Sequence, residues 1–248
     1  MTTNKEKVYN QIISAKQNDE KLLAFLLDPD KYSSSELKSL MQIIEKRPPH
    51  LIFVGGSLIS TPIDSYVKIL KQHIDVPIIL FPGHPAHICS GFDAILFLSM
   101  ISGRNPELLI GNQVVSAPII KRYGIESIAT GYILIDGGIS TSVEYMSNTR
   151  PIPSDKTDII VATAIAGEMM GNKMLYLDAG SGAINAISVK NIEKVKENCT
   201  IPLIVGGGIK TPEKLENAFK HGADIVVVGT ALEKSPEMMS EFLNVVGR

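Results

Sequence analysis

Short apolar segments rich in β-branched residues recur along the chain, and longer amphipathic stretches separate them. Strands that are apolar at nearly every position are typical of a parallel sheet buried on both faces, and apolar residues at helical spacing between them are typical of crossover helices. Eight such strands alternating with helices predict a (β/α)8 TIM barrel. The predicted strands are Leu22–Asp28, Leu51–Gly55, Pro77–Phe81, Ala94–Ser99, Ser127–Ile135, Met174–Asp178, Leu203–Val205 and Ile225–Val228.

Helices are predicted between these strands, and a further helix precedes the first strand. Thr211 is the expected cap of the helix that begins at Pro212, because a threonine hydroxyl can accept a hydrogen bond from a backbone N–H of the first turn. The predicted helices include Lys5–Lys16, Ser34–Glu45, Pro106–Tyr123, Lys156–Met170 and Pro212–His221.

Two segments depart from this alternation. Residues 82–93 contain two prolines and two glycines and are too few for a full crossover helix. We therefore expect a modified barrel in which the third helix is missing or reduced, with apolar strand surface left for a partner chain or an elongated apolar ligand to cover. Residues 136–155, which follow the fifth strand, are long enough to form an active-site loop.

Length and composition favour one soluble enzyme domain that spans residues 1–248. The 24 basic and 26 acidic residues nearly cancel, so no broad basic surface for nucleic acid is expected. Cys89 and Cys199 are far apart in the sequence, which favours free thiols in a reducing compartment. The polar first residues predict neither a signal peptide nor a transmembrane segment, and we expect a cytoplasmic protein.

Glycines follow the last two predicted strands. Gly206-Gly207-Gly208 comes after the seventh strand, and Gly229-Thr230 comes after the eighth. Glycines at these strand ends let backbone N–H groups approach an anion closely, and this pair of loops commonly binds phosphate in (β/α)8 barrels. The sequence therefore predicts a phosphorylated ligand.

The end of the sixth strand carries the densest group of candidate residues. Tyr176 and Asp178 alternate with Leu177 and are predicted to point into the barrel if Leu177 packs outward. Gly180-Ser181-Gly182 then supplies flexible backbone donors. Asp178 is a candidate for binding a polyol or accepting a proton from a hydroxyl, and the structural alternative is a carboxylate bonded to loop amides.

Candidate metal ligands lie at the ends of the first two strands. Asp28 is a natural ligand for Mg²⁺, which takes one or two protein carboxylates together with substrate phosphates, whereas Asp30 is favoured as a turn or cap residue. Ser57 can reach a metal or phosphate, and capping the next helix is an equal alternative. His84 and His87 are three residues apart without an acidic or cysteine companion, so turn or solvent roles are favoured over metal binding.

Several motifs together resemble the geranylgeranylglyceryl phosphate synthase family, whose members are prenyltransferases with a modified barrel that lacks the third helix. The similarity runs nearly end to end. The motifs are Leu27-Asp28-Pro29-Asp30, Val54-Gly55-Gly56-Ser57, Phe81-Pro82-Gly83, Thr130-Gly131-Tyr132-Ile133-Leu134-Ile135, Val143-Glu144-Tyr145, Pro151-Ile152-Pro153, Tyr176-Leu177-Asp178-Ala179-Gly180-Ser181-Gly182-Ala183, Val205-Gly206-Gly207-Gly208-Ile209 and Val228-Gly229-Thr230.

The resemblance implies a reaction between a polyprenyl diphosphate and sn-glycerol 1-phosphate, with Mg²⁺ held at Asp28 and Ser57 and with Asp178 and Tyr176 as catalytic residues. Members of the family commonly carry Glu where this chain has Asp178, which is shorter by one methylene. The family also forms dimers and hexamers, and a lipid donor is compatible with transient membrane contact. The implied glycerol phosphate site comprises Tyr176, Leu177, Asp178, Ala179, Gly180, Ser181, Gly182, Gly207, Gly208, Gly229 and Thr230.

Alternatives to a geranylgeranyl transferase stay open at this point. A heptaprenylglyceryl phosphate synthase would use the same motifs with a longer donor, because the length of the apolar groove is not set by a motif. A phosphosugar isomerase or aldolase would share the phosphate loops, but no strand end carries an obvious Schiff-base lysine. A phosphate-binding module without catalysis is the most distant alternative.

Overall fold

A closed barrel of eight parallel strands forms the centre of the computed structural model, which describes residues 6–247 apart from the side chains of Ser34 and Lys234. Strands that are neighbours in the sequence pair with one another, and β1 closes the barrel against β8. Every predicted strand is present, with its ends within one residue of the prediction. The strands are β1 (Leu22–Leu27), β2 (Leu51–Val54), β3 (Ile78–Leu80), β4 (Ala94–Met100), β5 (Glu126–Leu134), β6 (Met174–Asp178), β7 (Leu203–Gly206) and β8 (Ile225–Val228).

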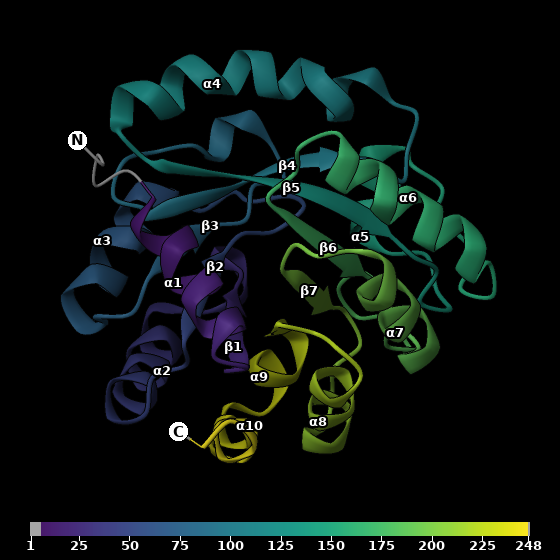
Figure 1. Cartoon of the computed structure of the whole chain (residues 1–248). Coiled ribbons are helices and arrows are strands. Elements are labelled where there is room, and N and C mark those ends of the chain that lie inside the picture. Colours follow the sequence, from purple (N-terminus) through teal and green to yellow (C-terminus); the bar gives the residue numbers. More distant parts are fainter. Residues whose placement is uncertain (1–5, 248) are drawn as a thin grey trace.

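Helices surround the barrel, and α1 lies across one end of it (Figure 1). The predicted helices are confirmed within the described residues, while Lys5 lies outside them. Thr211 caps α8 as expected, since its side chain accepts a hydrogen bond from the backbone N–H of Lys214. The helices are α1 (Lys7–Gln17), α2 (Ser34–Lys46), α3 (Ile63–His73), α4 (Asn112–Tyr123), α5 (Ser142–Ser147), α6 (Thr157–Met169), α7 (Val189–Asn198), α8 (Pro212–Lys220), α9 (Thr230–Lys234) and α10 (Met239–Val245).

The third crossover helix is missing. Between β3 and β4 the chain forms only the 3-10 turn η2 (Pro85–His87), which confirms the modified barrel. Two further 3-10 turns, η1 (Pro29–Lys31) and η4 (Pro236–Met238), follow β1 and α9. The crossover after β4 is helical, as predicted, but its first part is the π-helix η3 (Glu107–Gly111).

The π-helix has a local cause in side chains that hydrogen-bond to the backbone of this turn. The amide of Gln113 donates to the carbonyl oxygen of Leu108 over 3.1 Å, and the side chain of Asn105 accepts from the backbone N–H of Glu107 over 3.1 Å. Side chains that enter the hydrogen-bond ladder in this way disturb the regular α-helical pattern. Helical spacing of apolar residues predicts the helix but not this local change in its winding.

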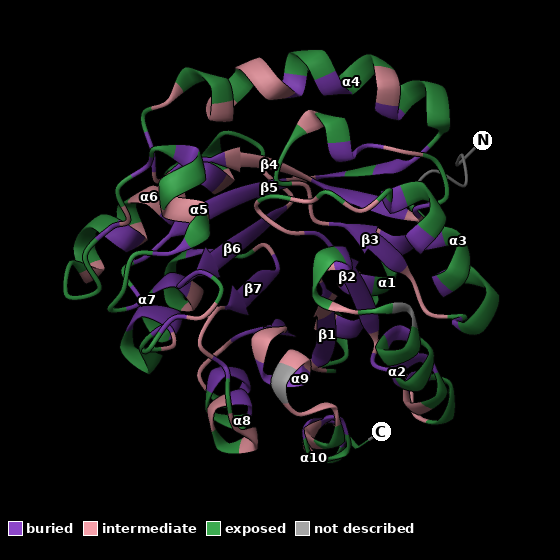
Figure 2. Cartoon of the chain, turned by 180° about the vertical axis from the view of Figure 1, so that it is seen from behind, coloured by how far each residue is buried: buried purple, intermediate pink, exposed green. Residues whose placement is uncertain are grey.

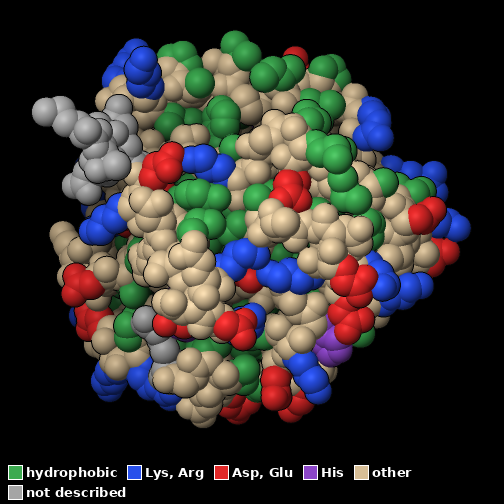
Figure 3. Space-filling view, viewed as in Figure 1, with side chains coloured by type: hydrophobic (Ala, Val, Ile, Leu, Met, Phe, Trp, Pro, Cys, Tyr) green, Lys and Arg blue, Asp and Glu red, His purple; other side chains and the backbone are tan. Residues whose placement is uncertain are grey.

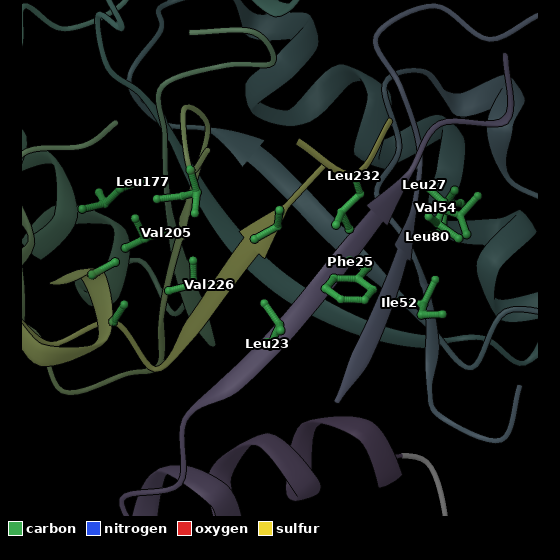
Figure 4. Close-up of a cluster of buried hydrophobic side chains, with 14 of the residues drawn as sticks. Leu23, Phe25, Leu27, Ile52, Val54, Leu80, Leu177, Val205, Val226 and Leu232 are labelled. Carbon is green, nitrogen blue, oxygen red and sulfur yellow. The ribbon is translucent and has the colours of Figure 1, made fainter. Parts of the chain in front are cut away.

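Alternation along the strands divides the core into two apolar layers. Outward side chains such as Leu23, Phe25 and Val226 pack between the barrel and its helices (Figure 4). Inward side chains such as Phe53 and Leu96 fill the barrel. The strands are buried on both faces, while the exposed positions lie mainly on the outer faces of the helices (Figure 2).

Helix α1 closes the amino-terminal end of the barrel. Its Val8 and Ile12 belong to the inner apolar cluster. Glu126, at the start of β5, accepts hydrogen bonds from the backbone N–H groups of Val8 and Tyr9 over 2.7 and 2.8 Å. These bonds satisfy two donors in the first turn of α1 that have no partner within the helix. With this end sealed, the open end of the barrel is the one where the strands terminate.

Candidate active site

A large cavity of about 1180 Å³ opens at the carboxyl ends of the strands. This is the end of a (β/α)8 barrel at which active sites are built. Leu177, Ala179 and Gly180 do not line the cavity, and Leu177 packs in the outer apolar layer, as alternation predicts. The predicted site residues that do line it are Asp28, Ser57, Tyr176, Asp178, Ser181, Gly182, Gly207, Gly208, Gly229 and Thr230.

The loops after β6, β7 and β8 meet at one side of the cavity. Gly207 and Gly208 have φ angles of +79° and +70°, in the left-handed region that glycine tolerates. The hydroxyl oxygens of Ser181 and Thr230 lie 3.1 Å apart and join the loop after β6 to the loop after β8. This arrangement provides backbone N–H groups and hydroxyls for an anion, as a phosphate site requires.

Asp178 is a buried carboxylate whose two oxygens are both hydrogen-bonded. The hydroxyl of Tyr132 donates to Oδ2 over 2.5 Å, and the backbone N–H of Gly180 donates to Oδ1 over 2.8 Å. Burial raises the pKa of Asp178, and these two hydrogen bonds oppose that rise. The bond to Gly180 corresponds to the structural alternative for Asp178, yet the side chain still lines the cavity. A carboxylate with a raised pKa is suited to accept a proton from a ligand hydroxyl.

Aromatic rings surround this carboxylate. The ring of Tyr176 stacks on Phe81 with centroids 5.4 Å apart, and it meets Tyr132 edge to face, also at 5.4 Å. Phe81 and Tyr132 belong to motifs shared with the family, but the sequence did not predict that they contact the site residues. Alternation along β5 points Tyr132 inward, but its contact with Tyr176 depends on the β5–β6 register, which pairs these two residues.

Asp28 fits a divalent cation by several features. Its side chain is half-buried, and burial raises its pKa, although Oδ1 accepts a hydrogen bond from the backbone N–H of Asp30 over 3.0 Å. A cation would compensate this incompletely paired carboxylate. The absence of a Cβ at Gly56 leaves room beside it, because such an atom would lie 2.8 Å from Oδ2. Ser57 follows Gly56 in the same cavity wall.

The described residues contain no cluster of three or more His, Cys, Asp or Glu that could hold a metal. An oxygen-ligand site built from Asp28 and Ser57 would therefore be completed by ligand phosphates and water, in the way that Mg²⁺ prefers. Ser57 does not cap a helix, because α3 begins at Ile63 and follows Pro62. The capping alternative for Ser57 is wrong.

Asp30 lies in the turn η1 and has a structural role, but it does not cap the next helix, because the N-cap of α2 is Ser33. Its carboxylate accepts hydrogen bonds from the backbone N–H groups of Ser60 and Thr61 and from the Ser60 hydroxyl, over 2.7, 2.8 and 2.9 Å. These bonds connect the turn after β1 to the loop before α3. They leave Asp28 as the carboxylate at this strand end that is suited to hold a metal.

The missing helix leaves an apolar groove that continues from the part of the cavity lined by Asp178. Its wall includes Ile95 and Phe97 from β4, Cys89 from the segment after η2, and Ser116 from α4. Residues 136–155 also reach the mouth, since Val143 and its neighbours on α5 line the cavity. The groove can hold an elongated apolar ligand, one of the two outcomes that the short crossover predicted.

Fold and site together define a (β/α)8 barrel with loops suited to phosphate and an adjoining apolar groove. Residues 15–246 match the model of the PcrB family, and the chain belongs to this family. A relative named geranylgeranylglyceryl phosphate synthase from Chitinophaga pinensis is 48% identical over 241 residues, which cover 97% of this chain and 96% of the relative. The resemblance seen in the motifs is thereby confirmed.

Two solved structures show the same architecture. The (S)-3-O-geranylgeranylglyceryl phosphate synthase from Thermoplasma acidophilum, in complex with its substrate sn-glycerol-1-phosphate, matches with a TM-score of 0.89 and 29% identity over 97% of both chains. The wild-type GGGPS from Thermoplasma volcanium matches with a TM-score of 0.89 and 32% identity, covering 97% of this chain and 96% of that one. Both likenesses extend over nearly the whole barrel.

Proposed function

We propose that this chain is a prenyltransferase that joins the C3 hydroxyl of sn-glycerol 1-phosphate to geranylgeranyl diphosphate and releases diphosphate. The observation that carries the proposal is a single cavity in which glycine-rich loops adjoin an apolar groove, with the Asp178 carboxylate in the wall. Glycerol phosphate would bind through its phosphate at the glycine-rich loops, and the prenyl chain of the donor would lie in the groove. The C3 hydroxyl of the first substrate and C1 of the second would then meet near this carboxylate. The product is geranylgeranylglyceryl phosphate.

The residues of the site support a direct transfer. Backbone N–H groups at Gly207, Gly208 and Thr230 bind the phosphate of glycerol phosphate, while Tyr176 and Asp178 orient its hydroxyls. Asp178 takes the proton of the C3 hydroxyl as this oxygen forms a bond to C1 of the donor. The bond between C1 and the diphosphate oxygen breaks, and its electron pair leaves with diphosphate. The aromatic faces beside C1 stabilise positive charge that develops on the allylic carbon.

Mg²⁺ is proposed as the cofactor. The ligands in this chain are the Asp28 carboxylate and the Ser57 hydroxyl, which line the cavity together. When bound, the ion would neutralise negative charge on the diphosphate leaving group. Replacing Asp28 by Asn should abolish Mg²⁺-dependent turnover while the circular dichroism spectrum and melting temperature stay close to those of the wild type.

The length of the prenyl donor depends on how far the apolar groove extends. The cavity volume of about 1180 Å³ lies above the usual range of roughly 300–1,000 Å³ for small-molecule pockets, as expected where a second substrate extends along a groove. A heptaprenyl donor would need the same phosphate loops and a longer groove. Geranylgeranyl diphosphate is proposed because the relatives found share that printed name.

The decisive experiment incubates the purified protein with radiolabelled sn-glycerol 1-phosphate, Mg²⁺ and a series of polyprenyl diphosphates, followed by organic extraction. Labelled lipid should be greatest with the geranylgeranyl donor. A maximum at longer donors would select a heptaprenylglyceryl phosphate synthase instead. No extractable label with any donor would refute prenyl transfer and favour a phosphosugar enzyme or a binding module.

A homo-oligomer, a dimer or a hexamer, is proposed from the surface of α4. The side chains of Val114 and Val115 are 64% and 61% exposed, and hydrophobic side chains gather over this helix (Figure 3). Exposed apolar faces of this kind favour association between subunits. Light scattering should therefore give a mass that is a multiple of the 26.9 kDa chain mass. A mass equal to that of one chain would contradict the proposal.

A cytoplasmic location is also proposed. Cys89 and Cys199 are free thiols, which suits a reducing compartment. Within the described part of the chain, no helix has both the length and the apolar character needed to cross a membrane. Cell fractionation should recover the protein with cytosolic markers, with a membrane-bound share only where it contacts its lipid substrate.

A further inference from the structure

Two histidines in the loop that replaces the third helix line the cavity without a role in the sites described above. His84 precedes η2 and is exposed, while His87 ends η2 and is buried. Both side chains line the cavity, and their ring centroids are 6.2 Å apart. The sequence favoured turn or solvent roles for them, and the structure does place both in hydrogen bonds of the turn.

These hydrogen bonds determine which ring nitrogen carries the proton. Nδ1 of His84 accepts from the backbone N–H of Ala86 over 3.1 Å, and Nδ1 of His87 accepts from the backbone N–H of Gly83 over 3.3 Å. A ring whose Nδ1 accepts carries its proton on Nε2 when neutral. Burial and the neighbouring His84 lower the pKa of His87, which favours this neutral form. Among the described residues, neither Nε2 has a hydrogen-bond partner.

The packing of Gly83 places this loop against the candidate metal ligands. A Cβ on Gly83 would lie 2.3 Å from the carbonyl oxygen of Gly56 and 3.1 Å from the Cα of Ser57, so the two backbones are in direct contact. Gly56 in turn lies against the carboxylate of Asp28. On its other side the loop continues into the apolar groove through Ile88. The histidines therefore lie between the proposed metal site and the groove.

We infer that His84 and His87 bind the diphosphate group of the prenyl donor through their Nε2–H groups. A diphosphate has two adjacent anionic groups, so one ligand can contact two donors that are presented from neighbouring rings. Hydrogen bonds from N–H groups to an anion are among the stronger ones in proteins. The pair holds the leaving group at the junction where the apolar chain begins. This inference rests on the proposed function, because that function supplies a diphosphate ligand.

Asparagine and glutamine variants separate this role from a purely structural one. Asparagine places its carbonyl oxygen near the position of Nδ1, so His84→Asn and His87→Asn keep the turn hydrogen bonds but lose the donor at Nε2. Glutamine places an amide N–H near the position of Nε2, so His84→Gln and His87→Gln keep that donor. A binding role and a turn role therefore predict opposite rankings of the two variants.

The measurement is titration calorimetry of the full-length protein with inorganic diphosphate and Mg²⁺, with sn-glycerol 1-phosphate as the control ligand. Each asparagine variant should bind diphosphate about 10- to 100-fold more weakly than wild type, while each glutamine variant stays near wild type. The affinity for sn-glycerol 1-phosphate should be unchanged in all four. Equal loss in both variants at a position, the reverse ranking, or no loss would overturn the inference for that histidine.

The binding assay also separates this inference from the proposed function. If no lipid forms with any donor but diphosphate binds and follows the predicted ranking, prenyl transfer is refuted and the diphosphate site stands. If lipid forms and the asparagine variants show an unchanged KM for the prenyl diphosphate, the transfer stands and the histidine site is refuted.

Discussion

Asp178 combines burial with access to the cavity, and this combination defines its expected chemistry. If it accepts the proton of the attacking hydroxyl, Asp178→Asn should lower kcat by about 100- to 10,000-fold, because general-base catalysis contributes roughly that much. The folded state should persist, since an amide is neutral and burial already disfavours the charged carboxylate. Initial rates of lipid formation and a thermal melt measure both effects. Asp19→Asn, on an exposed carboxylate that pairs with Lys21 away from the cavity, is the matched control and should leave kcat unchanged.

Burial raises the pKa of the Asp178 carboxyl, and the hydrogen bond that Tyr132 donates to Oδ2 lowers it. Since a base must be deprotonated, the rate should fall as the pH is lowered through the pKa of Asp178, which burial raises above the usual range for aspartate. The Tyr132 hydrogen bond lowers that pKa, so Tyr132→Phe should raise it further and move the acid limb of the kcat profile to higher pH. An acid limb that stays in place, with only a uniform loss of rate, would assign Tyr132 a packing role alone.

The loop proposed to bind phosphate needs glycine at position 207 for two reasons. The φ of Gly207, +79°, is unfavourable for other residues, and a Cβ would lie 2.7 Å from the backbone nitrogen of Gly180 and 2.8 Å from that of Ala179. Gly207→Ala should therefore raise KM for glycerol phosphate and destabilise the fold. Gly171→Ala is the control, because Gly171 has φ +89° with no atom within 4 Å. That control should cost only the backbone strain of about 1 kcal/mol, with KM unchanged. Similar KM values for the two variants would contradict the assignment.

At the scale of elements, the groove exists because β3 is followed by a turn instead of a helix. Ser116 lines this groove from α4, whereas the next residue, Ala117, is exposed on the outer face of the same helix. Ser116→Phe should obstruct the groove and lower kcat/KM for long donors far more than for short ones, because shorter chains need less of it. Ala117→Phe should change neither. Assays with a series of polyprenyl diphosphates make the comparison, and equal losses for all donors would show that Ser116 lies away from the prenyl chain.

The elements of the barrel were predictable from the sequence because each depends on local patterns. Burial on both faces produces continuous apolar strands, and the short proline-containing segment between β3 and β4 leaves no room for a helix. Alternation alone also orients Tyr176 and Asp178 inward. These inferences need no knowledge of which segments meet in space.

Features that depend on contacts between elements were not predictable in this way. The hydrogen bond from Tyr132 to Asp178 requires the β5–β6 register. The side chain of Gln113 at the π-helical start of the α4 crossover also donates to the carbonyl oxygen of Leu98 on β4, which fixes this turn against the barrel. The position of His87 beside the proposed metal site requires Gly83 to pack on Gly56. Each of these is a tertiary contact, and no local propensity or motif encodes it.

At the scale of the whole molecule, the two ends of the barrel have separate tasks, and Glu126 offers a test of that separation. It lies at the sealed end, where it accepts the backbone N–H groups of Val8 and Tyr9. Glu126→Ala would leave these donors without their acceptor and loosen α1 from the inner apolar cluster. The free energy of unfolding should fall by roughly 2 to 6 kcal/mol, because two donors lose their acceptor and each unsatisfied buried donor costs about 1–3 kcal/mol.

The kinetic constants of this variant should stay near those of wild type below its melting transition, since the cavity lies at the opposite end of the strands. Glu197→Ala is the matched control, because Glu197 pairs with Lys194 on the surface and such pairs contribute about 0–1 kcal/mol. Urea denaturation compares the stabilities, and KM for glycerol phosphate reports on the distant site. A rise in that KM for Glu126→Ala, without one for Glu197→Ala, would show that the seal formed by α1 also shapes the phosphate loops. The packing of α1 at one end of the barrel would then affect substrate binding at the other end, so stability and function would not be separate properties of the two ends.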